Sequence, residues 1–388
     1  MKTKIKNLFL LSELVAGLGL MPAGRVTAQI FTPLYSFANG NDGANPYGDP
    51  YALVLSGNTL YGTATFGGSS GNGTVFAINT NRTGFTNLHS FKATNRTTGI
   101  NSDGAEPNGL ILSGNTLYGT ATFGGSSGNG TVFAVNTNGT RFTNLHSFTA
   151  TDPTTGINSD GANPVVGLIL SGNTLYGTAT FGGSSSNGTV FAVNTNDTGF
   201  TNLHSFAALS APPPDGTNSD GAQPYAGLIL SGNTLYGAAT YGGSSGNGTV
   251  FAVNTNGTGF TNLHSFTATA PGIGTNSDGA NPQAGLVLSG NTLYGTAYNG
   301  GGSGYGTVFS LLLPPVSAPE LTITSSGANV ILTWPTNACG CNLQSTASLV
   351  SPVAWNAVSP APVVVKGQNT VANRASGTAV FYRLSLSP

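Results

Sequence analysis

Four histidines occupy one place in a recurring heptapeptide, FTNLHSF, and are the first candidates for metal chemistry. They are His89, His146, His204 and His264. A metal ion holds its ligands at about 2 Å, whereas equivalent places in successive repeats lie on separate outer strands. In the related stretch FTPLYSF at residues 31–37 the same place holds Tyr35. We therefore predict no metal and no other cofactor, and a structural role for the histidines in a half-buried aromatic slot.

Carboxylates recur in a second pattern, DGA.P, which suggests either turns or ligand contacts. Its aspartates are Asp42, Asp103, Asp160, Asp220 and Asp278, and three residues further on lie Asn45, Glu106, Asn163, Gln223 and Asn281. An aspartate before glycine stabilises a turn by bonding to its own backbone. The alternative is contact with a ligand or with Ca²⁺, although one carboxylate per loop falls short of the roughly six to eight oxygens of a calcium site. These ten residues are the candidate ligand-binding set.

Glycoside hydrolysis is the enzymatic alternative that the sequence offers. It needs two carboxylates about 5 to 9.5 Å apart in one cleft. The acids that break the repeat pattern are Asp49, Glu106, Asp152, Asp197 and Asp215. Because near-identical repeats argue against a single asymmetric centre, we expect no catalytic activity, and keep a glycoside hydrolase or lyase as the alternative.

A long repeat positions all of these residues. The motif SGNTLYG begins at residues 56, 113, 171, 231 and 289, which gives spacings of 57, 58, 60 and 58. Within each copy, GLILSG, NTLYGTAT, GTVFAVNT and GFTNLHSF are short apolar runs bounded by Gly or Asn, as is typical of strands. The Gly-Asn pair of SGNT suits a tight hairpin. Four antiparallel strands per copy, repeated five times, predict a five-bladed β-propeller.

The fifth copy is incomplete, and the start of the chain offers the missing piece. After residues 305–315 no FTNLHSF follows, whereas FTPLYSF stands alone at residues 31–37. Pairing this stretch with the third strand of the last copy would close the ring and cover an exposed strand edge. The prediction is therefore a propeller closed by an N-terminal strand.

Two kinds of loop meet on one face of the predicted disc, because strand direction alternates. One kind carries DGA.P, and the other carries GGSSGNG, which lacks the Lys-Ser/Thr of a phosphate-binding loop and is predicted to be a flexible connection. Aromatic residues near this face are candidate stacking platforms for a glycan, although they suit the core equally well: Tyr51, Phe66, Phe123, Phe181 and Tyr241.

One repeat unit reads SDGANP..GLILSGNTLYGTATFGGSSGNGTVFAVNTNGTGFTNLHSF. It resembles the GloVer tandem repeat, first noted in Gloeobacter and Verrucomicrobia. Proteins with this repeat are named "choice-of-anchor tandem repeat GloVer-containing". The resemblance covers residues 31 to about 311. It implies an extracellular or surface location and brings no established activity. The later motif LQST…FYRL is similar to a C-terminal module of many secreted Verrucomicrobial proteins.

The two ends of the chain complete the predicted organisation. Residues 1–28 combine a basic start, an apolar run and small residues before Ala28, which predicts a signal peptide. Residues 29–313 form the predicted propeller, 314–320 a Pro-rich linker and 321–388 a small β-sandwich with Trp334 and Trp355 in its core. Such strand patterns with buried tryptophan are typical of sandwiches.

Charge limits the partners of the mature chain. Without residues 1–28 the chain has seven Lys and Arg residues and eleven Asp and Glu residues, so we expect no nucleic-acid ligand. We expect a secreted or cell-surface monomer with no membrane span in the mature chain. Its expected partner is an extracellular glycan or another cell-surface component.

Overall fold

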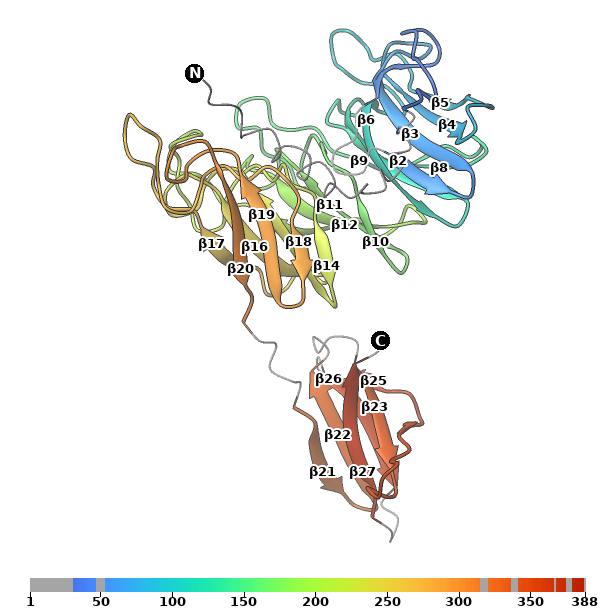
Figure 1. The fold of residues 1–388 in the computed structure, drawn as a ribbon, viewed down its shortest axis with the longest axis vertical. Helices are drawn as coiled ribbons and strands as arrows, with labels where there is room; N and C mark the ends of the chain where they lie inside the picture. Colours follow the sequence, from blue (N-terminus) through green and yellow to red (C-terminus); the bar gives the residue numbers. More distant parts are fainter. Residues whose placement is uncertain are drawn as a thin grey trace, which may run out of the picture. The chain divides into compact units, whose positions relative to one another are not determined.

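The described part of the protein consists of β-strands and the loops that connect them. A computed structural model describes residues 31–46, 53–314, 320–335, 341–365, 368–374 and 379–386 (Figure 1). Every regular element in these ranges is a strand, so the predicted all-β class is confirmed. The predicted signal peptide, residues 1–28, lies outside them. Within the described part, no helix is long and apolar enough to cross a membrane.

The repeat region forms a series of antiparallel sheets, one for each sequence repeat. The first sheet contains β1 (Ala44–Pro46), β2 (Leu53–Ser56), β3 (Thr59–Phe66), β4 (Thr74–Asn79) and β5 (Thr86–Ser90). The second contains β6 (Ala105–Ser113), β7 (Thr116–Phe123), β8 (Thr131–Asn136) and β9 (Thr143–Ser147). The third contains β10 (Ile169–Ser171), β11 (Thr174–Ala179), β12 (Thr189–Asn194) and β13 (Thr201–Ser205).

The fourth and fifth sheets continue the series. The fourth contains β14 (Ile229–Ser231), β15 (Thr234–Ala239), β16 (Thr249–Asn254) and β17 (Thr261–Ser265), and the fifth contains β18 (Val287–Ser289), β19 (Thr292–Ala297) and β20 (Thr307–Leu312). The four predicted runs of the repeat are therefore strands, as expected. The order of the fifth sheet ends at β20, as the truncated fifth sequence repeat requires.

Each first hairpin turns at the glycine of SGNT. Ser56 on β2 pairs with Thr59 on β3, and Gly57 between them has a φ of 57°. Only glycine adopts this left-handed backbone without steric cost, which explains why the same glycine recurs. Its φ is 55–57° at all the equivalent positions, Gly114, Gly172, Gly232 and Gly290.

Neighbouring sheets share hydrophobic cores. Tyr61 and Val75 of the first sheet pack with Leu117 and Phe133 of the second, and equivalent clusters join the second to the third, the third to the fourth and the fourth to the fifth. Contact is close, since a Cβ on Gly139 of the second repeat would lie 3.0 Å from the carbonyl oxygen of Leu88 in the first. The second, third and fourth sheets thus bury one face against the sheet before and the other against the sheet after.

The first and the last sheet of the series each expose a face that is buried in the other sheets. Val308 on β20 is 83% exposed, whereas its equivalent Val75 is fully buried. Leu53 on β2 is 53% exposed, whereas its equivalent Leu110 is 1% exposed. Residues 31–36 belong to a compact unit separate from residues 37–388, so the predicted pairing of FTPLYSF with the last repeat stays a prediction.

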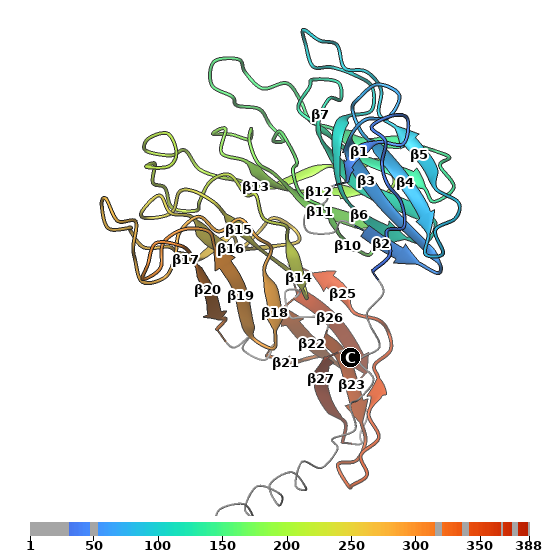
Figure 2. The same ribbon diagram turned by 45° about the horizontal axis from the view of Figure 1, so that its top comes forward.

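The C-terminal region consists of two sheets around a small core (orange to red in Figures 1 and 2). One sheet has the order β21-β22-β26-β25 and the other β24-β23-β27. The strands are β21 (Thr322–Ser326), β22 (Asn329–Pro335), β23 (Cys341–Thr346), β24 (Asn356–Ala357), β25 (Val363–Val365), β26 (Gln368–Arg374) and β27 (Phe381–Leu386). Trp334 and Leu343 lie in the shared core, as expected for Trp334. Trp355 is instead half-buried and lies outside this core cluster. Cζ of Arg383 lies 4.3 Å from the centre of the Trp355 ring, in a cation–π contact.

Candidate functional site

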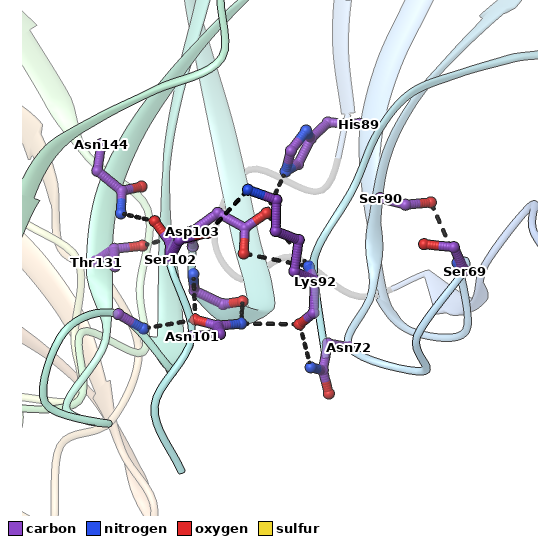
Figure 3. Close-up of polar contacts among 12 residues, drawn as sticks. Ser69, Asn72, His89, Ser90, Lys92, Asn101, Ser102, Asp103, Thr131 and Asn144 are labelled. Carbon is purple, nitrogen blue, oxygen red and sulfur yellow. Dashed lines mark hydrogen bonds and ion pairs between the residues drawn. The ribbon is translucent and has the colours of Figure 1, made fainter. Parts of the chain in front are cut away.

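The histidines tie each sheet to the turn that begins the next repeat (Figure 3). Nε2 of His89, on β5, lies 3.0 Å from Oδ2 of Asp103, just before β6. The same pair recurs as His146 with Asp160, His204 with Asp220 and His264 with Asp278, at 2.8, 2.9 and 2.9 Å. Each histidine therefore has its own carboxylate. The described residues hold no cluster of three His, Cys, Asp or Glu side chains arranged for a metal.

The rings of the first three histidines each stack on a phenylalanine of the following repeat. His89 lies parallel to Phe142 of the following repeat, with ring centres 3.6 Å apart. His146 and His204 stack on Phe200 and Phe260 in the same way. His264 belongs to the fourth repeat, and the next repeat has no FTNLHSF to supply a phenylalanine. Its side chain is 36% exposed against 16–18% for the other three.

The aspartates of DGA.P are held by the fold itself. Asp103, Asp160 and Asp220 are buried, and Oδ1 and Oδ2 of Asp103 accept the backbone N–H of Lys92 at 3.2 Å. Asp42, at the first repeat, accepts the N–H groups of Ala38 and Gly40. Polar groups buried in this way need such partners. The structure thus places Asp103, Asp160 and Asp220 in hydrogen bonds between repeats and Asp42 in a local turn, and the predicted contact of the aspartates with a ligand stays a prediction.

The electrostatics of two of these aspartates favour the ionised form. Burial acts to raise the pKa of Asp160, but hydrogen bonds from His146 and Thr149 outweigh it and leave the pKa below its ordinary value. The pKa of Asp278 is likewise lowered, because bonds from Thr267 and His264 outweigh burial. A charged carboxylate is therefore the form that the repeat junction selects.

From the second repeat on, the residue three positions after the aspartate is hydrogen-bonded to the preceding repeat. Asn163 has a left-handed φ of 55°; its backbone N–H donates to the carbonyl of Asn129 and its Nδ2 to the carbonyl of Thr122. Asn281 makes the same side-chain bond to Thr240. Glu106 shares the left-handed φ, at 57°, and donates its N–H to Asn72. An asparagine suits this place because it tolerates a positive φ.

A pocket of about 530 Å³ gathers residues from all five repeats. It is lined by Thr65 of the first repeat, Glu106, Asn108 and Thr122 of the second, Val165 and Val166 of the third, Tyr225 and Tyr241 of the fourth, and Gln283 of the fifth. Its volume is in the range of small-molecule sites. The pocket is therefore a candidate site for a small molecule.

One acid and two phenols set the chemistry of this pocket. Burial raises the pKa of Glu106. Burial also raises the pKa of Tyr225, and the nearby phenol of Tyr241 raises it further. None of the lining residues is Lys, Arg or His. The pocket therefore offers acceptors and aromatic surface, with no cation to attract an anion.

The structure separates the residues that the sequence singled out. Of the ten candidate ligand-binding residues, Glu106 alone lines the pocket, and of the candidate platforms Tyr241 does. Phe66 and Phe123 are 44% and 43% exposed, while Phe181 packs edge-on against Tyr225. Asp49 and Tyr51 lie outside the described residues.

The other described acids that break the repeat pattern lie in loops and turns. Oδ1 of Asp152 accepts the N–H groups of Thr154 and Thr155, and these bonds, Thr155 first, lower the pKa of Asp152. Asp197 sits in a turn with a φ of 61°. Asp152, Asp197 and Asp215 do not line the pocket with Glu106.

Sequence reasoning missed Asn108, Tyr225 and Gln283. Each of them directly follows the proline of DGA.P, as Val165 does in the third repeat. The signal was present, since this place changes from repeat to repeat directly after a proline that all five repeats keep. Variation inside an otherwise constant repeat marks positions that the fold does not determine.

Comparison with known families classifies the chain. The model of the Gloeobacter/Verrucomicrobia repeat matches residues 23–218 and 214–318. The chain belongs to this family. The match spans all five repeats of the Gloeobacter/Verrucomicrobia repeat protein, and the resemblance found in its sequence is thereby confirmed. No curated protein matches the chain.

Several solved structures are similar to this repeat protein. A chain of the nidogen/laminin complex shares 15% identity over 62% of this chain and 68% of its own, with a TM-score of 0.37. TolB from Acinetobacter baumannii shares 10% identity over 81% of this chain and 63% of its own, with a TM-score of 0.33. The N-terminal domain of Nup159 shares 10% identity over 88% and 92%, with a TM-score of 0.36. The family match remains the comparison that classifies the chain.

Proposed function

We propose that this repeat protein is a secreted or cell-surface binding protein without catalytic activity, whose ligand occupies the pocket beside Glu106. One observation carries the proposal: all five repeats contribute side chains to this pocket, and the residues after the DGA.P proline differ from repeat to repeat. The fold leaves this place free to vary, so that its side chains can be set by a ligand. Concave sites of this size with a few polar groups are the usual form of small-molecule sites.

The proposal includes a closed ring of five four-stranded blades. A groove of about 270 Å³ lies along β20, lined by residues that include His264, Asp278, Val308 and Phe309. In the other sheets the corresponding place is filled by the fourth strand, for example by β9 beside β8. Exposed apolar strand edges of this kind favour pairing with another strand. We assign the groove to residues 31–37 of the same chain.

The four complete repeats give the register of this closing strand. His146 pairs with Val132 and Thr143 with Ala134. By equivalence Tyr35 would pair with Val308 and Thr32 with Ser310. Phe31 would then lie where Phe142 and Phe200 stack on histidines, which places it on His264.

A screen for ligand-dependent thermal stabilisation tests the binding function. The mature full chain, residues 29–388, is exposed to a library of glycans, peptides and small metabolites. A ligand of the native state raises the melting temperature, since at a concentration of about 100 Kd it adds about 2.7 kcal/mol of stability. The matched variant is Gln283→Trp, which fills the pocket from an exposed position. Compounds that stabilise both proteins equally, or none at all, would overturn the proposal.

Glycoside cleavage is retained as a second candidate because of Glu106. Burial raises its pKa, as a general acid requires. The described lining residues supply a single carboxylate, whereas the reaction needs two. Cleavage of a polysaccharide panel by the wild type, abolished in Glu106→Gln, would replace the binding function by this one.

The expected location has its own test. Expression of the full chain with residues 1–28 should place the mature protein in the medium or on the cell surface, where added protease reaches it. Full-length protein retained in the cytoplasm would contradict the predicted signal peptide.

A further inference from the structure

Glu106 occupies a place where the repeat elsewhere uses an amide. Nδ2 of Asn163 and of Asn281 donates to a threonine carbonyl of the preceding repeat, at 3.1 Å in both cases. The equivalent carbonyl for Glu106 is that of Thr65. An ionised carboxylate has no N–H and only accepts hydrogen bonds. In its charged form Glu106 therefore gives up the bond that Asn163 and Asn281 make.

Glu106 is also poorly suited to its backbone and surroundings. Its φ is 57°, a conformation that asparagine adopts more readily than glutamate. Burial disfavours its charged form and raises its pKa. Strained or destabilising residues that persist in a fold point to a function at that site. Asparagine stands at this place in three of the five repeats, so the second repeat departs from its own pattern at the pocket.

The neighbours of Glu106 define what it can receive. Nδ2 of Asn108 donates to Thr122 and to the carbonyl of Pro164, so its donors serve the fold. Oγ1 of Thr65 is buried and has no partner among the described residues. No cation lines the pocket, so a carboxylate or phosphate ligand would meet Glu106 without compensation. A ligand that supplies hydroxyl donors fits these groups.

We propose that the pocket binds one unit of a neutral saccharide, with a ligand hydroxyl donating to the carboxylate of Glu106 and an aromatic face supplied by Tyr225 or Tyr241. The inference rests on the proposed binding function and names its ligand class. Sugars present C–H faces that pack on aromatic rings and hydroxyls that bond to acids and amides. Ca²⁺ is a poorer fit, because it takes about six to eight oxygens and the described lining offers one carboxylate.

The test combines binding and stability in the mature full chain. An array of neutral, amino and uronic glycans is probed with the wild type, and the strongest hit is measured by calorimetry with Glu106→Asn and Gln283→Trp. We expect neutral glycans to bind, and Glu106→Asn to weaken binding about 10- to 100-fold through loss of a charge-assisted bond. We also expect Glu106→Asn to melt about 1–3 °C higher, because the amide restores the bond to Thr65.

The control is the reverse change at an equivalent place. Asn163→Glu should lower the melting temperature, since it removes the bond to Thr122. Unchanged affinity in Glu106→Asn, or a lower melting temperature in it, would overturn the inference. Binding of uronic or amino glycans alone would overturn it as well. In each of these cases a loss of binding in Gln283→Trp would leave the pocket as the site and the proposed function intact.

Discussion

Phe37 packs edge-on against Phe76 with ring centres 5.1 Å apart, as Phe91 packs against Phe133 at 5.3 Å. Phe91 is the last residue of FTNLHSF in the first repeat, and Phe37 is the last residue of FTPLYSF. The end of the N-terminal stretch thus already makes, against the first sheet, the contact that every complete repeat makes against the next one.

A disulfide trap tests the proposed closing strand. Thr32→Cys and Ser310→Cys, in a background with Cys339→Ser and Cys341→Ser, should form an intramolecular bond on mild oxidation. Directly paired residues in antiparallel strands lie about 4.5–5.5 Å apart at Cα, within reach of a disulfide. Gel mobility under non-reducing conditions gives the result. Thr32→Cys with Ser289→Cys, which the register keeps apart, is the control, and a bond between two chains would show that a second molecule supplies the strand.

A double-mutant cycle tests the partner that the closing strand gives to His264. In the closed ring, Phe31→Ala and His264→Ala should each destabilise the protein, and the double variant should lose less than their sum, by about 0.5–1.5 kcal/mol. Denaturant unfolding measures the four proteins. Strict additivity would separate Phe31 from His264 and contradict the register.

Removal of a stacked histidine should weaken a repeat junction. His146 is bonded to the buried Asp160 and stacked on Phe200. We expect His146→Ala to cost about 2 kcal/mol, because it leaves a buried acceptor with fewer partners. Asp152→Ala, in an exposed loop, is the control and should change the free energy of unfolding far less. Equal effects of the two changes would argue against the structural role of the histidine.

Stability should fall in acid through Asp160 and Asp278. Their pKa values are lowered in the folded protein, so their stabilising contribution is present above the unfolded pKa of about 3.9 and is lost as pH falls through the folded values. Unfolding free energies between about pH 2 and pH 7 measure this loss. Asp160→Asn should flatten the dependence below about pH 4, and an unchanged slope would assign the acid sensitivity to other groups.

Close packing at the glycine of LYG predicts intolerance of even one methyl group. Gly119→Ala would place Cβ 2.7 Å from Cζ of Phe133 and 2.9 Å from Cδ2 of Leu110, so we expect a loss of about 1–3 kcal/mol. Gly302→Ala meets nothing within 4 Å and serves as the control. Thermal melting of both variants tests the difference, and equal melting temperatures would contradict the packing.

The sequence predicted the strands because their signals are local. The SGNT glycine and the alternating apolar runs recur in every repeat, and Gly57 has the φ that the hairpin prediction required. The structural place of the histidines was predictable for the same reason. Their partners were not, because His89 finds Asp103 and Phe142 in later parts of the chain, where a single repeat gives no register.

The pocket could not be predicted in this way. Its lining spans residues 65 to 283, and no local pattern shows that Glu106 and Tyr225 share a cavity. Trp355 was also wrongly expected in the C-terminal core. Its partner Arg383 lies on a strand far along the chain, and the contact of this cation with the indole ring has no local signal in the sequence.

The residue after the DGA.P proline has a wider consequence. The hydrophobic clusters that join the sheets contain other positions of the repeat, such as Val75 and Phe133. Point substitutions at Val165, Tyr225 or Gln283 can therefore alter the lining of the cavity without disturbing the framework. A gene that grows by copying one unit gains from this separation, because each copy can diverge at a single codon while the scaffold is inherited unchanged.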